Sequence, residues 1–322
     1  MTNPEVSVII PVYNAQDSIG KCIDSITSQT FNNFEVILVN DGSTDDTLFV
    51  LQKFEREYEN IKLINKKNEG VAITRNKAIL EAKGKYIMFI DNDDFIDKDY
   101  IETFYNEIEL RNADIIVGGY RRVSEKKELF KVRLTDSEWD KYIVISPWAK
   151  IYRRNFILEN NLEFLNYILG EDVYFNLAAY SKTKRVWCIS YIGYNWFDNQ
   201  ESISNTAHKG FKKEADILFL FNKLDEKIEM KDDFFKYYLK RFYIYYLLYS
   251  GRTASKKNFV HEVNRIMEWI NKRGYQSSIS PFNSRVSSDK LSTKLSIFTF
   301  ECIYKLKLLT LFAYIYCKGK EK

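Results

Sequence analysis

Over its first 120 residues the chain alternates short apolar runs with segments whose apolar residues recur at helical spacing. The apolar runs predict strands at residues 6–10, 34–39, 61–64, 86–90 and 115–117. The helical spacing between them predicts helices at residues 19–26, 48–58, 71–82 and 101–108. Strands that are apolar throughout are typical of a sheet covered on both faces. We therefore predict an α/β fold, Rossmann-like, with a mostly parallel sheet and helices on both faces.

After residue 120 this rhythm is lost. Residues 155–182 have a helical pattern around Gly170, residues 185–194 resemble a strand, and from about residue 209 the sequence is helical and rich in aromatic side chains. We predict an α/β domain over residues 1–205, with halves 1–120 and 121–205, followed by a C-terminal helical region over residues 206–322.

The cysteines and the apolar runs indicate a cytoplasmic protein. The four cysteines are far apart in sequence and show no CxxC spacing, which argues against a disulfide framework or a zinc site and fits a reducing compartment. The N-terminus has neither a basic segment nor a long apolar segment, so no signal peptide is expected. No run of 18 uncharged apolar residues occurs, so no ordinary membrane-spanning helix is predicted.

Charge is distributed unevenly along the chain. Residues 1–120 hold 12 Lys and Arg against 21 Asp and Glu, whereas residues 121–322 hold 36 against 23. A basic second part can be a solvated face, or it can serve an anionic lipid surface, a phosphorylated substrate or a nucleic acid. Neither a zinc-finger nor an RNP motif is present, so a nucleic acid partner is not expected.

Polar and acidic residues follow three of the predicted strands, at residues 11–14, 41–46 and 91–94. In open parallel sheets ligands bind at the carboxyl ends of the strands. One such cluster alone could simply cap a helix, as Ser43 or Thr44 could. Three clusters at one edge of one sheet favour a binding site.

The cluster Asp91-Asn92-Asp93-Asp94 concentrates carboxylates after a buried strand. Hard oxygen ligands in this pattern suit Mg²⁺ or Mn²⁺, with a phosphate completing the coordination shell. The chain has neither GxxxxGK[ST] nor GxGxxG, which disfavours kinases, P-loop enzymes and dinucleotide-binding enzymes together.

Five segments taken together resemble family-2 glycosyltransferases with the GT-A fold, of the type that builds bacterial surface polysaccharides. They are VSVIIPVYNAQDSIGKCIDSI, FEVILVNDGSTDDT, NEGVAITRNKAI, YIMFIDNDDFID and GEDVYFNL, in that order from Val6 to about Leu177. The resemblance covers more than half of the chain. It implies a nucleotide-sugar half at residues 1–120 and an acceptor half at residues 121–205.

The resemblance also implies roles for individual residues. Asp41 would accept a hydrogen bond from uracil N3–H and Tyr13 would pack on the ring. Asp93 and Asp91 would bind the metal that bridges the diphosphate, and His208 is a further candidate ligand, although a lone histidine is more often structural. The residues implied for the donor nucleotide are Pro11, Tyr13, Asp41, Asn68, Gly70, Arg75, Asp91 and Asn92.

In the family pattern, the acceptor side lies in the second half. Asp172 would be the base that deprotonates the acceptor hydroxyl, and Glu171 would orient the acceptor, although both could instead satisfy the dipole of a helix that they open. Trp148 and Lys150 lie in PWAKIYRR, which resembles the acceptor-side loop, but an exposed basic loop is an equal alternative. The QxxRW motif of processive members is absent, which favours addition of one sugar per acceptor.

These features lead us to expect a metal-dependent, inverting glycosyltransferase with a UDP-hexose donor. The acceptor would be a growing surface glycan on a lipid carrier, or a glycoprotein. Two alternatives stay open: a sugar-nucleotide pyrophosphorylase, which shares an α/β nucleotide-sugar fold, and a catalytically dead carbohydrate-binding scaffold. The N-terminal strand lacks the glycine-rich loop of the former, and intact Asp91, Asp93 and Asp172 argue against the latter.

The last segment, residues 291–322, is apolar but interrupted by Lys305 and Lys307. It is too short to span a bilayer, which takes roughly 20 apolar residues. Two interpretations remain. It is either a buried helix packed against the aromatic segment 234–249, or a peripheral contact with the anionic inner face of the cell membrane.

Overall fold

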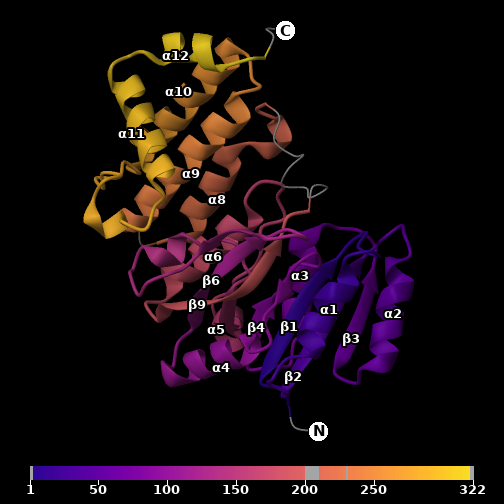
Figure 1. Ribbon diagram of the computed structural model, residues 1–322. Helices are drawn as coiled ribbons and strands as arrows, with labels where there is room; N and C mark the ends of the chain where they lie inside the picture. The colour runs from indigo at the N-terminus through magenta and orange to yellow at the C-terminus, as the bar shows by residue number, and fades with distance from the viewer. Residues whose placement is uncertain (1–2, 200–209, 230, 320–322) are drawn as a thin grey trace. The chain divides into compact units, whose positions relative to one another are not determined.

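The computed structural model describes residues 3–199, 210–229 and 231–319, and the chain forms two compact units (Figure 1). The first unit comprises Met1–Asn166 and Glu171–Asn199, and the second comprises Tyr167–Gly170 and Gln200–Lys322. The domain boundary predicted near residue 205 lies outside the described residues.

A single sheet forms the centre of the first unit, with the order β3-β2-β1-β4-β8-β6-β9-β5 and with β7 paired to β6. Six of its nine strands run in one direction, because β5, β7 and β8 alone are antiparallel to their neighbours. The strands are β1 (Val6–Val12), β2 (Phe34–Asp41), β3 (Ile61–Lys66), β4 (Tyr86–Phe89), β5 (Phe95–Ile96), β6 (Ile115–Val123), β7 (Glu128–Val132), β8 (Lys150–Arg153) and β9 (Val186–Phe197). The predicted mostly parallel α/β sheet is confirmed.

One strand could not be anticipated from the alternation of the first 120 residues. β8 lies between β4 and β6 and is antiparallel to both, pairing Ile87 with Tyr152 and Ile116 with Ile151. The two parallel strands are therefore not direct neighbours. Ile151 and Tyr152 are completely buried, so this short segment fills the middle of the sheet.

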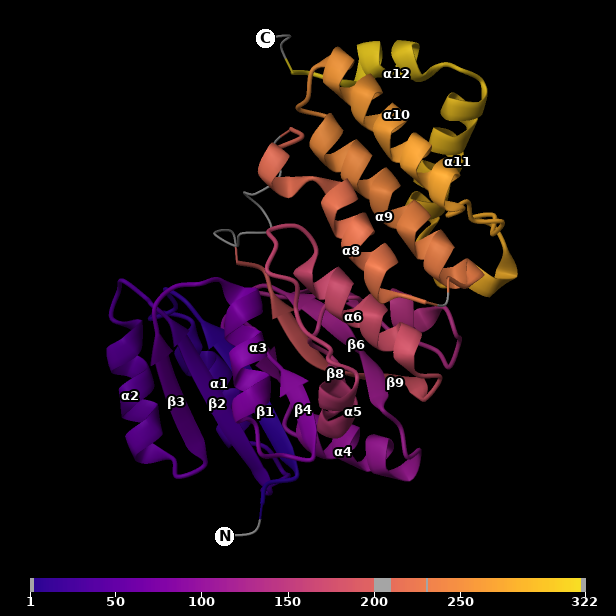
Figure 2. The same cartoon turned by 180° about the vertical axis from the view of Figure 1, so that it is seen from behind.

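Helices cover both faces of the sheet. α3, α5 and α6 lie on the face turned toward the viewer in Figure 2, and α1 and α4 lie on the opposite face. On that opposite face Gln29, just after α1, accepts a hydrogen bond from Ile101 N of α4. The predicted helical stretch 155–182 is two helices with an irregular segment between them. The helices of this unit are α1 (Ile19–Thr27), α2 (Thr47–Glu57), α3 (Val71–Glu81), α4 (Tyr100–Leu110), α5 (Arg154–Glu159) and α6 (Glu171–Lys182), with a 3-10 turn at Asp140–Tyr142.

The second unit is helical, as expected for the C-terminal region. Asp216, Asp232 and Ser255 cap three of its helices by accepting hydrogen bonds from main-chain N–H groups of the first turn. In the described parts of the chain, none of the helices combines the length and the apolar character that crossing a bilayer requires. Its helices are α8 (Ile217–Lys227), α9 (Asp233–Gly251), α10 (Lys256–Arg273), α11 (Leu291–Lys305) and α12 (Leu309–Tyr316), with 3-10 turns at Lys213–Ala215 and Ser284–Val286.

Candidate active site

The parallel register brings the ends of three strands to one edge of the sheet. β1 pairs with β2 up to Val12 and Asn40, and with β4 up to Ile9 and Phe89. The residues that follow these strands therefore lie at the same edge, as their positions in the sequence predict. Pro11 is buried within β1, whereas Tyr13, just beyond it, is 44% exposed.

The loops after β1 and β2 are joined by hydrogen bonds. Asn14 Oδ1 accepts from Thr44 N at 2.8 Å, and Asn14 N donates to Ser43 Oγ at 3.0 Å. Ser43 in turn donates to Asn40 Oδ1 at 2.6 Å, while α2 begins only at Thr47. Ser43 and Thr44 thus hold the two loops together and do not cap α2.

Asp41 is 4% exposed and has several donors within the protein. Oδ1 accepts from Lys66 Nζ and from Glu69 N, and Oδ2 accepts from Gly70 N at 2.9 Å. Burial alone would raise the pKa of Asp41, but these hydrogen bonds and the Lys66 charge outweigh it and lower the pKa. An ionised carboxylate has about four lone-pair positions, so Oδ2 keeps one for a further donor.

A pocket of about 560 Å³ opens beside Asp41, between the ends of β2 and β3. Gly42 permits its shape: its φ is +69°, and an added Cβ would lie 2.6 Å from Asn68 N. Asn68, one of the implied donor residues, lines this pocket. The lining residues are Asn40, Gly42, Ser43, Leu48, Asn65, Lys66, Lys67 and Asn68.

Arg75 on α3 connects the end of β4 with the start of α6. It is 4% exposed; its Nη2 lies 2.7 Å from Asp91 Oδ1, and its Nη1 lies 3.6 Å from Glu171 Oε1. Burial alone would lower the pKa of Arg75, but Asp91 and Glu171 raise it. Among the described residues, neither Nε nor Nη1 of Arg75 has a hydrogen-bond partner, although both are buried.

Negative charge gathers after β4. Burial, and then the neighbouring Asp91 carboxylate, raise the pKa of Asp93, whose hydrogen bond from Asn199 Nδ2 is 3.5 Å long. Asp94 is 1% exposed and accepts from Tyr194 OH at 2.6 Å and from Phe197 N at 2.8 Å. Its pKa is raised well above the ordinary value by burial and by the other two aspartates. Asn92 lies half-buried in the turn between them.

The aspartates of this cluster could hold a divalent cation only if a bound substrate supplied further oxygen atoms to the metal. In the described ranges there is no group of three or more His, Cys, Asp or Glu side chains arranged to hold a metal ion. Asp94 is engaged by Tyr194 and the main chain, which leaves Asp91 and Asp93 as oxygen ligands. Asp91 already pairs with Arg75, but it still raises the pKa of Asp93, so a cation between the two carboxylates would relieve their repulsion, with a diphosphate supplying the remaining oxygens. His208 lies outside the described residues.

The acidic pair opens α6, where both the catalytic and the helix-capping interpretations place it. Burial, followed by the Asp172 charge, raises the pKa of Glu171 to about 7, although Arg75 opposes this. Burial also raises the pKa of Asp172, although its hydrogen bond from Val173 N and the charges of Arg75 and Lys150 act in the other direction. A carboxylate with a raised pKa is suited to accept a proton near neutral pH.

Lys150 is not part of an exposed basic loop, so that alternative is wrong. It is completely buried in β8, and its Nζ donates to Val144 O at 2.6 Å and to Ser146 O. Burial lowers the pKa of Lys150 to about 7, while the Asp172 charge acts against this. The side chain folds back on the loop before β8.

Asn176 fastens the same loop to α6. Its Nδ2 donates to Ile145 O at 2.7 Å and to Asp172 O at 3.0 Å, and its Oδ1 accepts from Tyr152 OH at 2.8 Å. Tyr152 belongs to β8. Lys150 and Asn176 together fix the start of α6, and with it the Asp172 backbone, relative to the sheet.

Trp148 is 7% exposed and stacks on Tyr194, with ring centroids 4.6 Å apart and planes 5° apart. Because Tyr194 donates to Asp94, the loop that carries Trp148 also supports the aspartate cluster. The sequence motifs did not identify Lys66, Asn176 or Tyr194 as residues of the site. GEDVYFNL does contain Asn176, four residues after Asp172 and therefore on the same helix face, which is a signal that could have found it.

Known proteins resemble this chain in sequence and in fold. The profile of the family described as Glycosyl transferase family 2 matches residues 7–168, half of the chain. Glycosyltransferase GlyA of Streptococcus pneumoniae serotype 4 is 34% identical over 206 residues, which are 58% of this chain and 29% of that protein. The poly(ribitol-phosphate) beta-glucosyltransferase of Bacillus spizizenii is 34% identical over 195 residues, 56% of this chain and 30% of that protein. The alignments thus cover less than a third of either relative's length.

Among solved structures, the S. aureus TarS fragment 1–349 in complex with UDP has a TM-score of 0.64 at 19% identity, with 94% of this chain and 92% of that chain covered. The mannosyltransferase PcManGT from Pyrobaculum calidifontis, in complex with GDP-Man and Mn²⁺, has a TM-score of 0.54 at 15% identity, with 97% of this chain and 86% of that chain covered. At these identities the likeness shows a shared fold.

Proposed function

The chain belongs to glycosyltransferase family 2, and from this membership we propose that it moves a hexose from a UDP-sugar to a growing surface glycan with inversion of the anomeric centre. The observation that carries the proposal is the Arg75 bridge, in which one buried guanidinium contacts both Asp91 and Glu171. It joins the acidic cluster after β4 to the acidic start of α6. Asp91, on the proposed donor side, and Glu171, on the proposed acceptor side, are thereby held close enough to act on a sugar donor and its acceptor together.

The donor is proposed to bind along the carboxyl edge of β1, β2 and β4. The base would be recognised by Asp41, whose Oδ2 keeps one acceptor position, with Tyr13 against the ring. Asn68 and Gly70 would contact the ribose, and the Arg75 guanidinium, held by Asp91 and Glu171, would flank the ribose and phosphates. The UDP complex of the TarS fragment and the GDP-Man complex of PcManGT support a nucleotide-sugar donor for this fold, and the proposal of uridine rests on Asp41 and Tyr13.

The reaction is a single in-line displacement. Asp172 accepts the proton of the acceptor hydroxyl while its oxygen forms the bond to the anomeric carbon. The bond from that carbon to the diphosphate oxygen breaks, and UDP leaves with the electron pair. Lys150 and Asn176 act on this step by holding the start of α6, and Glu171 orients the acceptor.

We propose that Asp91 and Asp93 hold a Mn²⁺ or Mg²⁺ ion when donor is bound, and this ion would neutralise charge on the leaving diphosphate. The raised pKa of Asp93 supports this, because burial and the Asp91 charge outweigh the hydrogen bonds and the Arg122 charge that favour the ionised carboxylate. The GDP-Man and Mn²⁺ complex of PcManGT gives further support from a protein of the same fold.

The acceptor is proposed to be a glycan on a lipid carrier, or a glycoprotein, extended by one sugar at a time at the cytoplasmic face of the membrane. The name of the Bacillus spizizenii relative, a glucosyltransferase acting on poly(ribitol-phosphate), supports a hexose and a cell-surface acceptor. The absence of QxxRW from the sequence supports single addition.

Release of UDP from a panel of UDP-hexoses, with Mn²⁺ and with EDTA, tests the proposal. A hexosyltransferase releases UDP from one or a few donors, and only with metal. A sugar-nucleotide pyrophosphorylase would instead need pyrophosphate and form UTP. A carbohydrate-binding scaffold would release nothing from any donor, and either of these results would overturn the proposal.

A further inference from the structure

The last two helices expose apolar side chains at helical spacing. On α11, Leu291, Leu295 and Phe298 are between 48% and 66% exposed, and they are spaced to lie along one side of the helix. At α12, Leu308, Leu311 and Ile315 are between 43% and 75% exposed with the same kind of spacing. We call these six side chains the C-terminal apolar face. Scattered exposed leucines are ordinary, but two such rows in one short segment indicate an interaction surface.

The opposite sides of both helices are packed within the second unit. Ile297 and Phe300 of α11 are buried, and so are Leu309 and Ala313 of α12. Glu301 on α11 forms a 2.8 Å ion pair with the buried Lys240 of α9. The buried-helix interpretation therefore accounts for one side of this segment only. The C-terminal apolar face stays exposed in the folded unit.

Positive charge accompanies the apolar face. Residues 290–319 contain five lysines and one acidic residue, Glu301, which already pairs with Lys240. Lys305 and Lys307 are exposed in the turn between the helices, and Lys318 is exposed after α12. A second copy of this chain would present the same positive charge and be repelled. A partner with a layer of negative charge over an apolar interior would match both the exposed lysines and the exposed apolar side chains.

We infer that the C-terminal apolar face binds the surface of an anionic bilayer, with its leucines, phenylalanine and isoleucine among the acyl chains and its lysines at the head groups. α11 has 15 residues and α12 has 8, whereas a spanning helix needs roughly 20, so the segment lies on the bilayer and does not cross it. The inference goes beyond the proposed function and concerns only binding of the membrane, whichever sugar is transferred.

Sedimentation of the full chain with vesicles tests this, using phosphatidylcholine alone and phosphatidylcholine with 30% phosphatidylglycerol at low and high salt. We expect binding to the anionic vesicles and a loss of at least tenfold in L295S/F298S and in L311S/I315S. The variant K305Q/K307Q should lose binding mainly at low salt, because salt screens exposed charges. L80S and F49S, at side chains 71% and 70% exposed in the first unit, are the matched controls and should bind normally.

Melting temperature shows that each variant is folded, and UDP release shows whether the proposed function holds independently of vesicle binding. Equal binding to neutral and anionic vesicles, or unchanged binding of both apolar variants, would overturn the inference. Sedimentation equilibrium without lipid tests whether the C-terminal apolar face instead binds a second copy of the chain. If the wild type is a dimer and L295S/F298S is a monomer, the face is a dimer interface and the inference is overturned.

Discussion

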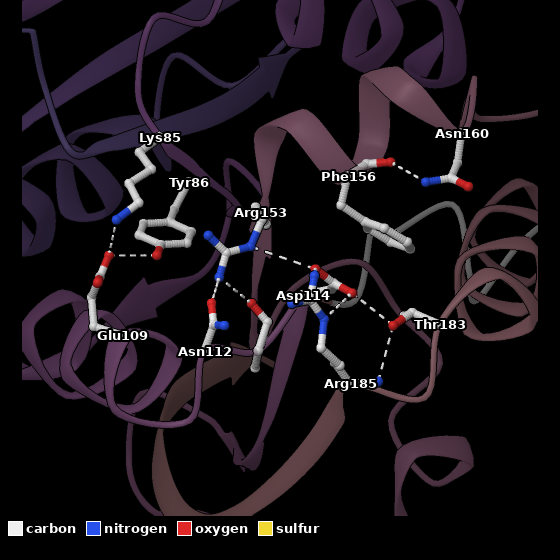
Figure 3. Close-up of polar contacts among 11 residues, drawn as sticks. Lys85, Tyr86, Glu109, Asn112, Asp114, Arg153, Phe156, Asn160, Thr183 and Arg185 are labelled. Carbon is white, nitrogen blue, oxygen red and sulfur yellow. Dashed lines mark hydrogen bonds and ion pairs between the residues drawn. The ribbon is translucent and has the colours of Figure 1, made fainter.

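Buried aspartates at the two ends of the central sheet have opposite surroundings. At the amino end of β6, Asp114 is 3% exposed, and Arg185, Arg153 and Thr183 surround its carboxylate (Figure 3). Arg185 Nε donates at 3.0 Å and Thr183 Oγ1 at 2.6 Å, while Arg153 Nε lies 3.5 Å away. At the carboxyl end of β4, Asp93 has Asp91 as a like-charged neighbour, and its hydrogen bond from Asn199 Nδ2 is 3.5 Å long.

This difference distinguishes carboxylates that stabilise the fold through partners in the protein from carboxylates that would be stabilised by a bound substrate or metal ion. A buried carboxylate is costly unless it is paired and hydrogen-bonded. Asp114 meets this condition within the protein (Figure 3). The exposed Glu109 nearby also accepts hydrogen bonds, from Lys85 and Tyr86. Asp93 is less well compensated, because burial and the Asp91 charge raise its pKa. Burial and the Asp172 charge likewise raise the pKa of Glu171 to about 7, in spite of its ion pair with Arg75. Such groups concentrate at functional sites.

The largest expected effect is that of Asp172→Asn. The change keeps the shape of the side chain and removes its ability to accept a proton, so turnover should fall by about 10²–10⁴-fold while UDP still binds. Because the pKa of Asp172 is raised, wild-type kcat should decline as pH falls, beginning above the ordinary aspartate range of about 4. Steady-state kinetics and UDP titration measure both quantities. Normal turnover in this variant would place the base elsewhere; Asp99→Asn serves as the control.

Metal removal should have the next largest effect. Excess EDTA should abolish activity and Mn²⁺ should restore it. Asp93→Ala should lower turnover by about 10²–10³-fold, the loss typical of one group that stabilises developing charge. UDP release with and without each metal gives the result. Undiminished activity in EDTA would contradict the metal assignment.

Most of the half that holds the donor could be predicted from sequence. The strands after which Tyr13, Asp41 and Asp91 lie are continuous apolar runs, and their parallel order brings those residues to one edge of the sheet. Gly84 is an exception, because its sequence position suggests a helix cap. α3 instead ends at Glu81, and Gly84 is required since an added Cβ would lie 2.5 Å from Ser7 N.

The acceptor half was less predictable because its important contacts are non-local. Lys150 is a lysine in a polar-looking segment, and only the antiparallel insertion of β8 shows that it is buried. Asn176 lies four residues after Asp172 on the same helix, but no local pattern relates it to Ile145 and Tyr152, which it also contacts. Lys66 pairs with Asp41 across 25 residues, through the neighbouring strand ends of β2 and β3.

Nucleotide preference should give a smaller, measurable effect. Asp41 is proposed to leave one acceptor position for uracil N3–H. Guanine also has an N–H donor, but its larger bicyclic ring should place that donor away from a position set for a pyrimidine, so Asp41 should be left unpaired. At about 100 times its Kd, UDP should stabilise the protein by about 2.7 kcal/mol, which is several degrees in Tm. GDP should give much less, and Asp41→Asn should narrow the difference. Equal protection of the wild type by both nucleotides would refute the assignment.

The smallest expected effect is on the pH dependence of stability. The pKa of Glu171 is about 7 when folded and roughly 4.3 when unfolded, so the folded state holds the extra proton between these values. Stability contributed by this group therefore falls as pH rises from about 4 to 7. Glu171→Gln should raise Tm at pH 8 by more than at pH 5, in thermal melts. A larger gain at pH 5 would show that Glu171 is well compensated.

The most direct test of the contrast between the two ends of the sheet is to measure Tm and UDP release together in Asp93→Asn and Asp114→Asn. We predict that Asp93→Asn loses turnover and keeps or gains Tm, because it removes a carboxylate whose ionised form is disfavoured by burial and by the Asp91 charge. Asp114→Asn should lower the free energy of unfolding by about 1–3 kcal/mol, since it weakens a satisfied buried acceptor, and keep its turnover per folded molecule. Retained turnover in Asp93→Asn, or an equal loss of Tm in both variants, would contradict the account.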